Sequence, residues 1–555
     1  MLLLGSNALA QTITVDLALD DFTDFGGAQT VADLPGPDGH VTLREAVYAA
    51  NNTAGPQTIA FAIPLSEWSI FSSVMAIIRL DMMLYVSDDE TTLDFATQTA
   101  FTGDTNPDGT EAGLQYAGPP AGIPSLWIAA NDCTVRGLGF SFGNNVGNTV
   151  WITGNQNRVL GCTTNGLTIR GDYGGGAFNV IGGTNPGDGN VFSEGVNVHS
   201  RANDNVLVGN QFHWSLRITG DTFWGLCERN RVGGAGAAER NVLAGHGYYG
   251  EEGFPTGVQL EVSYARNTVI QGNYVGTTTD GLSKYPGWSG TGGIGVGIGA
   301  EDTLVRDNLV AGIVMIGANH YQGQRFGIGI GVVASARNTT LAGNRVGLAA
   351  DGVSPIPNVG GILVQTNPNG APNNTLVGGP ELQDANEVAF NESRGVSVGF
   401  ATNGVRLQRN SIHDNGELGI DLLGWSDSGV TPNDELDADD QGGNHLQNFP
   451  VIVGALRGTQ ATLVVGWLES EPMQSFALDF YASPALDPSG FGEGSFYLGS
   501  TAAATAADGR VAFRVQLPNL APVGWFITAT ATQLARGETS EFCAGQVLRL
   551  PLRRR

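Results

Sequence analysis

The sequence predicts an all-β chain, in which a right-handed parallel β-helix has an N-terminal helical cap and is followed by a C-terminal β-sandwich. Three observations lead to this fold class. Short β-branched runs broken by Gly, Asn, Asp and Thr recur along the chain, which is typical of many short strands joined by tight turns. Several of these segments repeat with nearly the same pattern. One helix signal precedes the repeats.

Composition and charge narrow the class of protein. Gly contributes 82 of the 555 residues and charged residues only 14%, unlike a disordered polyelectrolyte or an ordinary helical enzyme. The formal net charge is −26, from 53 acidic and 27 basic residues, and Lys284 is the only lysine. Because an acidic surface repels phosphate backbones and anionic headgroups, we expect neither nucleic acid nor membrane partners.

The ends of the chain bear on its location. Residues 1–10 indicate the tail of a secretory signal peptide, because an apolar stretch leads to the small-x-small pattern Ala8-Leu9-Ala10. No later apolar run reaches membrane-spanning length, and residues 549–555 form a short basic tail. We therefore expect a secreted protein that is extracellular or held at the cell surface.

Residues 11–61 are assigned to the N-terminal cap segment. In DGHVTLREAVYAANN, Thr42 and Glu45 have the spacing of a capping box, which predicts a helix that runs to about Asn51. Leu43, Ala46, Val47 and Ala50 share one face of that helix, which can cover the first coil. The segment QTIAFAIP that follows is interpreted as the first core strand.

Repeats assign residues 62–449 to the β-helix. NTVIQGNYVGTTTDGLSKYP, from Asn267, and NTTLAGNRVGLAADGVSPIP, from Asn338, share N-T-x-(I/L)-x-G-N-x-V-G-x-x-x-D-G, and a second type of unit starts at Asn179, Asn230 and Asn374. Each unit supplies a short strand that buries alternate Val, Ile or Leu, and Gly-Asn is expected to form the left-handed turn before the next strand. Stacked units bury a core between neighbouring rungs and need a cap at each end.

Residues 450–548 are assigned to an immunoglobulin-like β-sandwich. TLVVGW, FALDFYAS, VAFRVQLP and FITATATQ alternate apolar and polar residues, and Asp508-Gly509 is a turn signal between two of them.

The cysteines do not indicate a zinc or redox site. They are widely spaced and form no C-x-x-C pair. Cys133 and Cys162 are about one rung apart, so they could stack and pair, but free buried thiols fit equally well. The other two are Cys227 and Cys543.

The segment DGHVTLREAVYAANN followed by QTIAFAIP resembles the Cys-Ser-Leu-Arg-Glu-Ala segment that opens many bacterial secreted parallel β-helix proteins, with Val41 in place of their usual Cys. The repeats, the segment DNGELGIDLLGWSDSGVTPNDELDADDQGGNHLQNFPV and the segment DPSGFGEGSFYLGS are similar to the same family, in which Leu486 is often Cys. This resemblance covers nearly the whole chain. It implies a pectin-lyase-like β-helix with an immunoglobulin-like β-sandwich, in surface or secreted proteins without one shared activity.

An Asp- and Asn-rich segment after Gly419 predicts a structural Ca²⁺ site. Clustered oxygen donors separated by flexible Gly and Ser suit Ca²⁺, which takes about six to eight oxygens in loose geometry. An alternative remains open, in which the segment is a solvated turn between coil and sandwich and its Asp and Asn form Asx turns. The candidate ligands are Asp421, Asp427, Asp434, Asp437 and Asp439. No other cofactor is expected.

Insertions within residues 212–290 are rich in aromatic residues. Sugar rings stack on exposed aromatic faces, so this region predicts a carbohydrate-binding groove, although the same rings could fill gaps between uneven rungs. The candidate carbohydrate-binding residues are Trp214, Trp224, Tyr248, Tyr249 and Trp288.

If the protein is an enzyme, its chemistry needs paired carboxylates, or a base beside a group that neutralises a uronate carboxylate. Glu251 with Glu252 and Glu301 with Asp302 are candidate pairs by proximity in sequence. His246 lies in a Gly-His-Gly segment similar to that of polygalacturonases, but a turn substitution explains it as well. For a lyase, Arg217 is among the arginines near the aromatic insertions.

Two functions therefore remain open. The first is a secreted or cell-surface protein that binds a polysaccharide, a cell-surface glycan or another surface partner along one flank of the β-helix. The second is a polysaccharide lyase or glycoside hydrolase that acts in a groove lined by the 212–290 insertions. A purely structural spacer is disfavoured, because a spacer needs no insertions. The sequence does not predict the oligomeric state.

Overall fold

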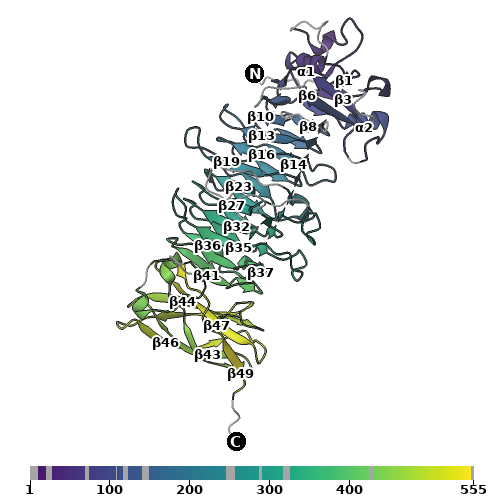
Figure 1. Cartoon of the computed structure of the whole chain (residues 1–555). Coiled ribbons are helices and arrows are strands. Elements are labelled where there is room, and N and C mark those ends of the chain that lie inside the picture. The colour runs from purple at the N-terminus through teal and green to yellow at the C-terminus, as the bar shows by residue number, and fades with distance from the viewer. Residues whose placement is uncertain are drawn as a thin grey trace, which may run out of the picture. The chain divides into compact units, whose positions relative to one another are not determined.

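The computed structural model describes residues 10–20, 28–68, 74–107, 109–116, 123–140, 149–245, 257–286, 290–316, 325–423, 429–438 and 441–551 (Figure 1). It divides into two compact units, Met1–Val242 and Leu243–Arg555. Among the described residues, no helix has both the length and the apolar character needed to cross a lipid bilayer.

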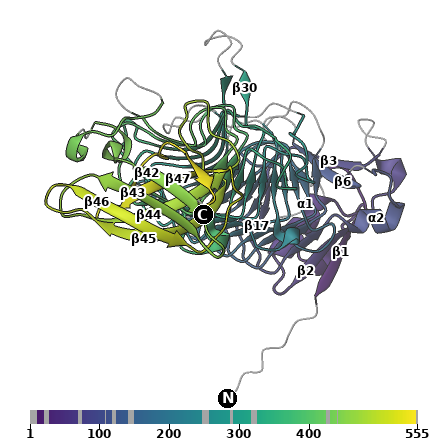
Figure 2. The same cartoon turned by 90° about the horizontal axis from the view of Figure 1, so that it is seen from below.

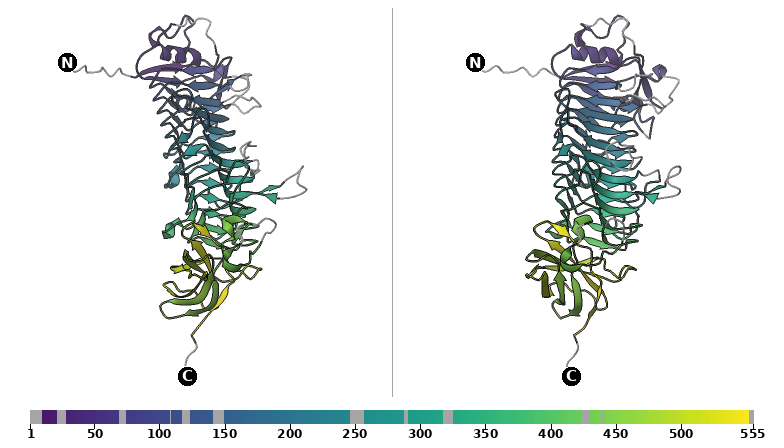
Figure 3. Two further views of the ribbon diagram at one scale, coloured as in Figure 1. Left: turned by 90° about the vertical axis from the view of Figure 1, so that its left-hand side faces the viewer. Right: turned by 60° about the vertical axis from the view of Figure 1, so that its left-hand side comes forward.

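Unit 1 is a coil in which each rung gives one strand to each of three parallel sheets, named after their first strands (Figure 3). The β1 sheet contains β1 (Gln11–Val15), β2 (Gln57–Phe61), β5 (Thr92–Asp94), β8 (Thr134–Arg136), β11 (Arg158–Leu160), β14 (Val180–Gly182), β17 (Val206–Val208) and β21 (Arg231–Gly233). The β3 sheet contains β3 (Ala76–Leu80), β6 (Ala112–Tyr116), β9 (Gly139–Phe140), β12 (Thr163–Thr164), β15 (Val191–Phe192) and β18 (Gln211–Phe212). The β4 sheet contains β4 (Leu84–Val86), β7 (Leu126–Ile128), β10 (Thr149–Ile152), β13 (Gly166–Arg170), β16 (Val196–His199) and β19 (Leu216–Thr219).

Aliphatic side chains stack inside the coil because the strands keep one register. Val135, Val159, Ile181 and Leu207 occupy matching positions on consecutive strands of the β1 sheet, and each is fully buried. Alternate residues point to opposite faces of a strand, so the residues between them face outward. This alternation separates a scaffold interior from an outer surface that is available for function.

The predicted N-terminal cap is confirmed as α1 (Leu43–Asn51). The hydroxyl of Thr42 accepts from the backbone N–H of Glu45 at 3.2 Å, and the Glu45 carboxylate accepts from the backbone N–H of Thr42 at 2.7 Å. This is the reciprocal capping box that the sequence predicts. The predicted apolar face is buried as well, as expected for Leu43, Ala46, Val47 and Ala50.

Two features of this end were not anticipated from the sequence. β1 precedes α1 and pairs in parallel with β2, so the sheet begins at Gln11, ahead of the predicted first core strand. Arg44 is also buried on the cap, where it forms an ion pair with Asp20 at 2.7 Å and donates to the carbonyl of Met82 at 2.7 Å. A short helix, α2 (Thr97–Thr102), follows β5.

We expect Thr42→Ala to lower the free energy of unfolding by about 1 kcal/mol, because it removes the side-chain half of the capping box. Chemical denaturation followed by circular dichroism measures this change. Thr184→Ala is the matched control, since Thr184 is an exposed threonine in a turn of the same unit. A loss for Thr42→Ala no larger than that of Thr184→Ala would contradict the role of the cap.

The coil of unit 2 is built in the same way. One sheet contains β25 (Val269–Gln271), β28 (Leu304–Arg306), β33 (Thr340–Ala342), β36 (Thr375–Gly378) and β39 (Val405–Gln408). A second contains β26 (Tyr274–Val275), β29 (Leu309–Val310), β34 (Arg345–Val346), β37 (Glu387–Ala389) and β40 (Ser411–His413). The third contains β23 (Val258–Ser263), β27 (Gly292–Val296), β32 (Ile328–Val333), β35 (Gly360–Gln365), β38 (Val396–Val398) and β41 (Ile420–Leu422). The short strands β30 (Met315–Ile316) and β31 (Arg325–Phe326) pair antiparallel.

In the recurring Gly-Asn pairs of the sequence, the glycine and the asparagine have different roles. Gly343 has a φ of 65° and makes the left-handed turn between β33 and β34, as predicted for Gly. Asn344 does not make that turn, because its side chain points into the coil and is fully buried. It belongs to a ladder of stacked amides on successive rungs, with Asn308 before it and Asn386 after it. A ladder of stacked asparagines is also present in unit 1, where no Gly precedes its members Asn157, Asn179, Asn205 and Asn230.

The C-terminal strands form an eight-stranded sheet around one hydrophobic core (Figure 2). The strands are β42 (Val451–Arg457), β43 (Thr462–Glu469), β44 (Ser475–Ser483), β45 (Phe496–Ala504), β46 (Arg510–Leu517), β47 (Phe526–Gln533), β48 (Glu538–Thr539) and β49 (Gln546–Arg549). β47 pairs with both β44 and β49, and β49 pairs with β42. The two halves of the predicted sandwich are therefore joined into one barrel-like sheet rather than kept as separate sheets.

Within unit 2, acidic side chains of this C-terminal sheet region cap the end of the coil. The side-chain oxygens of Glu541 accept from the backbone N–H groups of Leu422 and Thr431, both at 3.0 Å. Glu493 accepts from the N–H groups of Asp414 at 2.7 Å and Asn415 at 3.1 Å. The last coil strands would otherwise leave such groups without a partner, which is costly when they are buried.

All four cysteines are buried and carry free thiols. Burial raises the pKa of Cys133 and of Cys162 to about 12, which keeps both thiols protonated and unreactive. The chain is thus an all-β, right-handed parallel β-helix with a helical cap and a C-terminal β domain, as the sequence predicts.

Candidate functional site

An aromatic row lies on the outward face of the β4 sheet in unit 1. Tyr85, Trp127 and Trp151 occupy matching positions on β4, β7 and β10, while their neighbours in the strands point inward and are buried. The ring centroids are 5.4 Å apart for Tyr85 and Trp127, and 5.9 Å apart for Trp127 and Trp151. Tyr173, in the turn after β13, adds a fourth ring 5.4 Å from Trp127. Because Tyr85 is 44% exposed and Tyr173 is 54% exposed, the row is open to solvent.

Arg170 extends this row from the end of β13. Its guanidinium carbon is 4.9 Å from the ring centroid of Trp151 and 4.9 Å from that of Tyr173. Asp172 accepts two hydrogen bonds from the same guanidinium, at 3.1 and 2.6 Å, and this pairing raises the pKa of Arg170. Two rings and one carboxylate thus fix the orientation of a cation at the surface.

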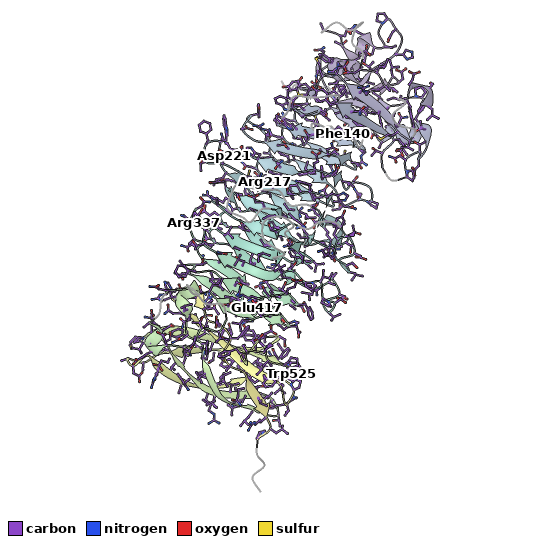
Figure 4. All side chains as sticks on the ribbon, viewed as in Figure 1. Phe140, Arg217, Asp221, Arg337, Glu417 and Trp525 are labelled. Atoms are coloured by element: carbon purple, nitrogen blue, oxygen red, sulfur yellow. The ribbon has the colours of Figure 1, made fainter. Side chains whose placement is uncertain are left out.

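Polar residues continue the outward face on the next two strands. His199 on β16 lies directly opposite Arg170 on β13, and Arg217 on β19 lies opposite Asn197 on β16. Arg217 and Asp221 lie in the same part of unit 1 (Figure 4). The outward face therefore changes along the sheet from aromatic to polar, with His199 on the strand between those of the two arginines.

A hydrogen-bonded chain connects His199 to the turn after β19. The hydroxyl of Ser200 contacts Nδ1 of His199 and donates to the carboxylate of Asp221 at 2.7 Å. Asp221 also accepts from the backbone N–H groups of Phe223 at 2.8 Å and Trp224 at 2.5 Å. These bonds form because the chain reverses between Asp221 and Gly225, where the two residues bridge.

The surroundings shift the pKa of both ends of this chain. Burial, together with the positive charges of Arg170 and Arg217, lowers the pKa of His199 below its usual value, although Asp172 and Asp221 act in the opposite direction. Burial acts to raise the pKa of Asp221, but the hydrogen bonds from Ser200, Trp224 and Phe223 outweigh it and leave the pKa lowered. At neutral pH the imidazole is therefore neutral and the carboxylate is ionised.

The structure describes two of the predicted carbohydrate-binding residues. Trp224 is 49% exposed and packs edge to face on Phe223, with their ring centroids 4.9 Å apart. It stands beside the chain from Asp221 to His199, because its backbone is bonded to Asp221. Trp214 lies in the turn before β19 and is partly buried. Tyr248, Tyr249 and Trp288 lie outside the described residues.

The predicted carboxylate pair Glu301 and Asp302 is held by structural contacts. Glu301 accepts from the guanidinium of Arg266 at 2.9 and 2.7 Å. Asp302 has a φ of 53° and accepts from the side-chain amide of Asn338 at 2.9 Å, in an outer ladder of turn residues. Their carboxylates are thus engaged in separate contacts. The other predicted catalytic residues, His246, Glu251 and Glu252, lie outside the described part of the chain.

The predicted calcium ligands have protein partners where the structure describes them. Asp421 pairs with Arg394, Asp434 accepts from the backbone N–H of Ala438 at 2.9 Å, and Asp437 accepts from the hydroxyl of Ser470 at 2.6 Å. Burial raises the pKa of Asp437 to about 6. Over the described ranges, no three His, Cys, Asp or Glu side chains come together as a metal site. Asp427 and Asp439 lie outside those ranges, so calcium binding stays a prediction.

Sequence reasoning missed the residues of the aromatic row, and of the polar face it named Arg217 but neither His199 nor Asp221. A signal was present, because Leu126-Trp127-Ile128 and Val150-Trp151-Ile152 place Trp between two buried aliphatic residues on successive rungs. Such a triplet marks an outward-facing aromatic residue. By contrast, only the tertiary fold brings His199 close to Asp221, which is on the next rung.

Comparison with known proteins gives a similarity of fold. No protein-family model matches the chain, and no curated protein is significantly similar to it. Among the solved structures that are similar to it are three polysaccharide lyases. A PL6 alginate lyase in complex with a trisaccharide is 12% identical, with 73% of this chain and 85% of that chain covered and a TM-score of 0.32. The alginate lyase AlyF-OU02 in complex with G6 is 10% identical, with coverages of 62% and 78% and a TM-score of 0.29. A mannuronic acid-specific polysaccharide family 6 lyase from the human gut microbiota is 10% identical, with coverages of 66% and 75% and a TM-score of 0.27. No functional argument follows from similarities this low.

Proposed function

We propose that the protein binds a polysaccharide along the outward face of the β4 sheet in unit 1. The observation that carries the proposal is the aromatic row, in which Tyr85, Trp127 and Trp151 follow one another in register on consecutive strands. Aromatic rings offer flat apolar faces and polarised edges to the C–H groups of sugars. Parallel strands are about 4.8 Å apart, so the row is an extended platform suited to a chain of sugars rather than to one small molecule.

The exposure of the row supports binding over a purely structural role. Rings that only fill gaps between rungs would be covered by the chain, whereas Tyr85 and Tyr173 are about half exposed. Trp127 is also held in place, because its indole N–H donates to the hydroxyl of Thr153 at 2.8 Å. A rigid platform loses little conformational entropy when a ligand binds.

The proposal includes a location outside the cell or on its surface. The small-x-small pattern at Ala8-Leu9-Ala10 supports it. An extracellular polysaccharide or a cell-surface glycan is then the natural partner.

We expect Trp151→Ala to weaken polysaccharide binding about 10- to 100-fold, because it removes the ring that lies between Trp127 and Arg170. Affinity gel electrophoresis against a panel of neutral and uronate-containing polysaccharides identifies a retained ligand, and isothermal titration then measures its affinity. Trp467→Ala is the control, since Trp467 is a partly exposed tryptophan of the C-terminal sheet. The proposal fails if no polysaccharide on the panel retards the native chain, or if Trp151→Ala binds as tightly as the native chain does.

A further inference from the structure

The polar end of the same face contains a side chain arranged to accept a proton. Asp221 is ionised and can only accept hydrogen bonds, so the proton of the Ser200 hydroxyl is directed to Asp221. The oxygen of Ser200 then accepts from Nδ1–H of His199. These two hydrogen bonds place the ring proton of His199 on Nδ1 and leave Nε2 as the unprotonated nitrogen. Ser200 and Asp221 are thus positioning residues that fix the tautomer of His199.

Two guanidinium groups lie on the strands that flank His199, and one of them, that of Arg170, is paired with Asp172. His199 lies on β16, between β13 with Arg170 and β19 with Arg217, and all three side chains face outward. Both arginines act electrostatically on His199, as do Asp172 and Asp221. In a protein of net charge −26, these two arginines lie with two carboxylates, Asp172 and Asp221, around His199. A carboxylate is a ligand that two guanidinium groups can bind and neutralise.

The inference rests on the proposed function, since the aromatic row delivers the sugar chain to this end of the sheet. We propose that His199 is the general base of a polysaccharide lyase, and that the protein cleaves uronate-containing polysaccharides by β-elimination. Arg170 and Arg217 would hold the carboxylate of the reacting sugar. They would also stabilise the negative charge that this carboxylate gains in the transition state.

The step balances without any co-reactant. Nε2 of His199 takes the proton from C5, the carbon next to the carboxylate, and the C5–H electron pair forms a C4=C5 double bond. The C4–O bond breaks, and its electron pair stays on the leaving oxygen, which takes a proton from the imidazolium or from water. One chain becomes two, with an unsaturated uronate at one new end, and nothing is oxidised or reduced. Because its pKa is lowered, His199 is unprotonated at neutral pH before the step and can accept the C5 proton.

The test uses the full chain with polygalacturonate, alginate and a glucuronate-containing polysaccharide, with starch as the neutral substrate. We expect one of the uronate polymers to give products whose ultraviolet absorbance shows the conjugated double bond, and starch to give none. His199→Gln should lower the turnover of that polymer about 10²- to 10⁴-fold while gel retention of the polymer is unchanged. His40→Gln, the same change at an exposed histidine of unit 1, should keep full activity.

Ser200→Ala tests the positioning role. We expect a smaller loss of turnover, together with a changed pH profile, because the hydroxyl no longer ties Nδ1 to Asp221. A structural defect alone would leave the shape of the profile unchanged, so an unchanged profile overturns the role of Ser200.

The outcomes separate this inference from the proposed function. A polymer that is retained by the native chain but yields no unsaturated product overturns the elimination and leaves binding intact. New reducing ends without the ultraviolet signal would show hydrolysis and overturn it as well. If the His199→Gln variant turns over the polymer as fast as the native chain does, His199 is not the base and the inference is overturned. Failure to retain any polysaccharide rejects the proposed function itself.

Discussion

Asn344→Ala is expected to lower the free energy of unfolding by about 3–5 kcal/mol, because it removes a fully satisfied buried amide from the centre of a ladder. The side-chain oxygen of Asn344 accepts from the backbone N–H of Asn308 at 3.1 Å and from its side-chain amide at 3.0 Å. Its side-chain amide donates to the carbonyl of Val305 and to the side-chain oxygen of Asn386, both at 2.9 Å.

The size of this loss follows from the partners that remain. Alanine leaves the N–H of Asn308 and the carbonyl of Val305 buried with one fewer partner each, and it also opens a small cavity. Each buried polar group left unsatisfied costs about 1–3 kcal/mol. Asn344→Leu, which keeps the number and branching of the side-chain heavy atoms, separates the two contributions, since it fills the cavity but does not restore the hydrogen bonds.

Equilibrium denaturation with urea measures the change. Asn369→Ala is the matched control, because Asn369 is an exposed asparagine in a turn of the same unit. We expect the control to stay within about 0.5 kcal/mol of the native chain. A loss below about 1 kcal/mol for Asn344→Ala would mean that the ladders do not hold the rungs together.

The second large effect is a loss of stability with rising pH, which we assign to Glu541. Burial raises the pKa of Glu541 to about 8, with a further contribution from Asp421, while its bonds to the backbone of Leu422 and Thr431 act against the shift. The carboxyl group is therefore protonated in the folded protein over a range in which the unfolded chain is ionised.

The direction of the effect follows from this difference. Because the folded pKa lies above the unfolded value, the contribution of Glu541 is complete below about pH 4.5 and is lost as the pH rises towards 8. A shift of this size corresponds to roughly 5 kcal/mol, since one pKa unit is worth about 1.4 kcal/mol. Asp437, with a pKa of about 6, acts with the same sign. We expect the melting temperature of the chain to fall between pH 5 and pH 8.

Glu541→Gln should flatten this dependence, because the amide cannot ionise and resembles the protonated carboxyl group in shape. Differential scanning calorimetry from pH 5 to pH 8 compares the slopes of the native chain and the variant. Glu435→Gln, at an exposed glutamate of the same unit, is the control and should keep the native slope. If the melting temperatures of Glu541→Gln and of the native chain fall equally steeply with pH, Glu541 is not the cause of the pH dependence.

Local patterns were enough to predict several elements correctly. The capping box of Thr42 and Glu45 involves residues within one turn of helix, so it is readable from sequence alone. The repeats from Asn267 and Asn338 predict strands whose buried residues alternate; β25 follows that pattern, whereas in β33 the adjacent Leu341 and Ala342 are both buried. The turn at Gly343 was predictable from the local sequence as well, because glycine takes a φ of 65° more readily than other residues do.

Contacts between rungs were not predictable in this way. Asn344 follows a glycine and is of a residue type that is common in turns. Its hydrogen-bond partners Asn308 and Asn386 lie 36 and 42 residues away in the sequence, so only the stacking of rungs makes Asn344 a buried member of a ladder. The joining of β47 to β49 likewise depends on how the two halves of the C-terminal sheet meet. No pattern within one strand records that pairing.

The candidate site shows the same division. The sequence by itself determined the β-helix, its helical cap and the presence of a C-terminal β domain, because these depend on hydrophobic periodicity and on hydrogen bonds between near neighbours. It directed attention to aromatic insertions, of which Trp224 proves to stand beside Asp221. The tertiary structure alone decided which outward residues share a face. The register of the parallel strands places Trp127 beside Trp151 and His199 beside Arg170 on neighbouring strands. Register is fixed by core packing across rungs, and the sequence of one rung does not contain it.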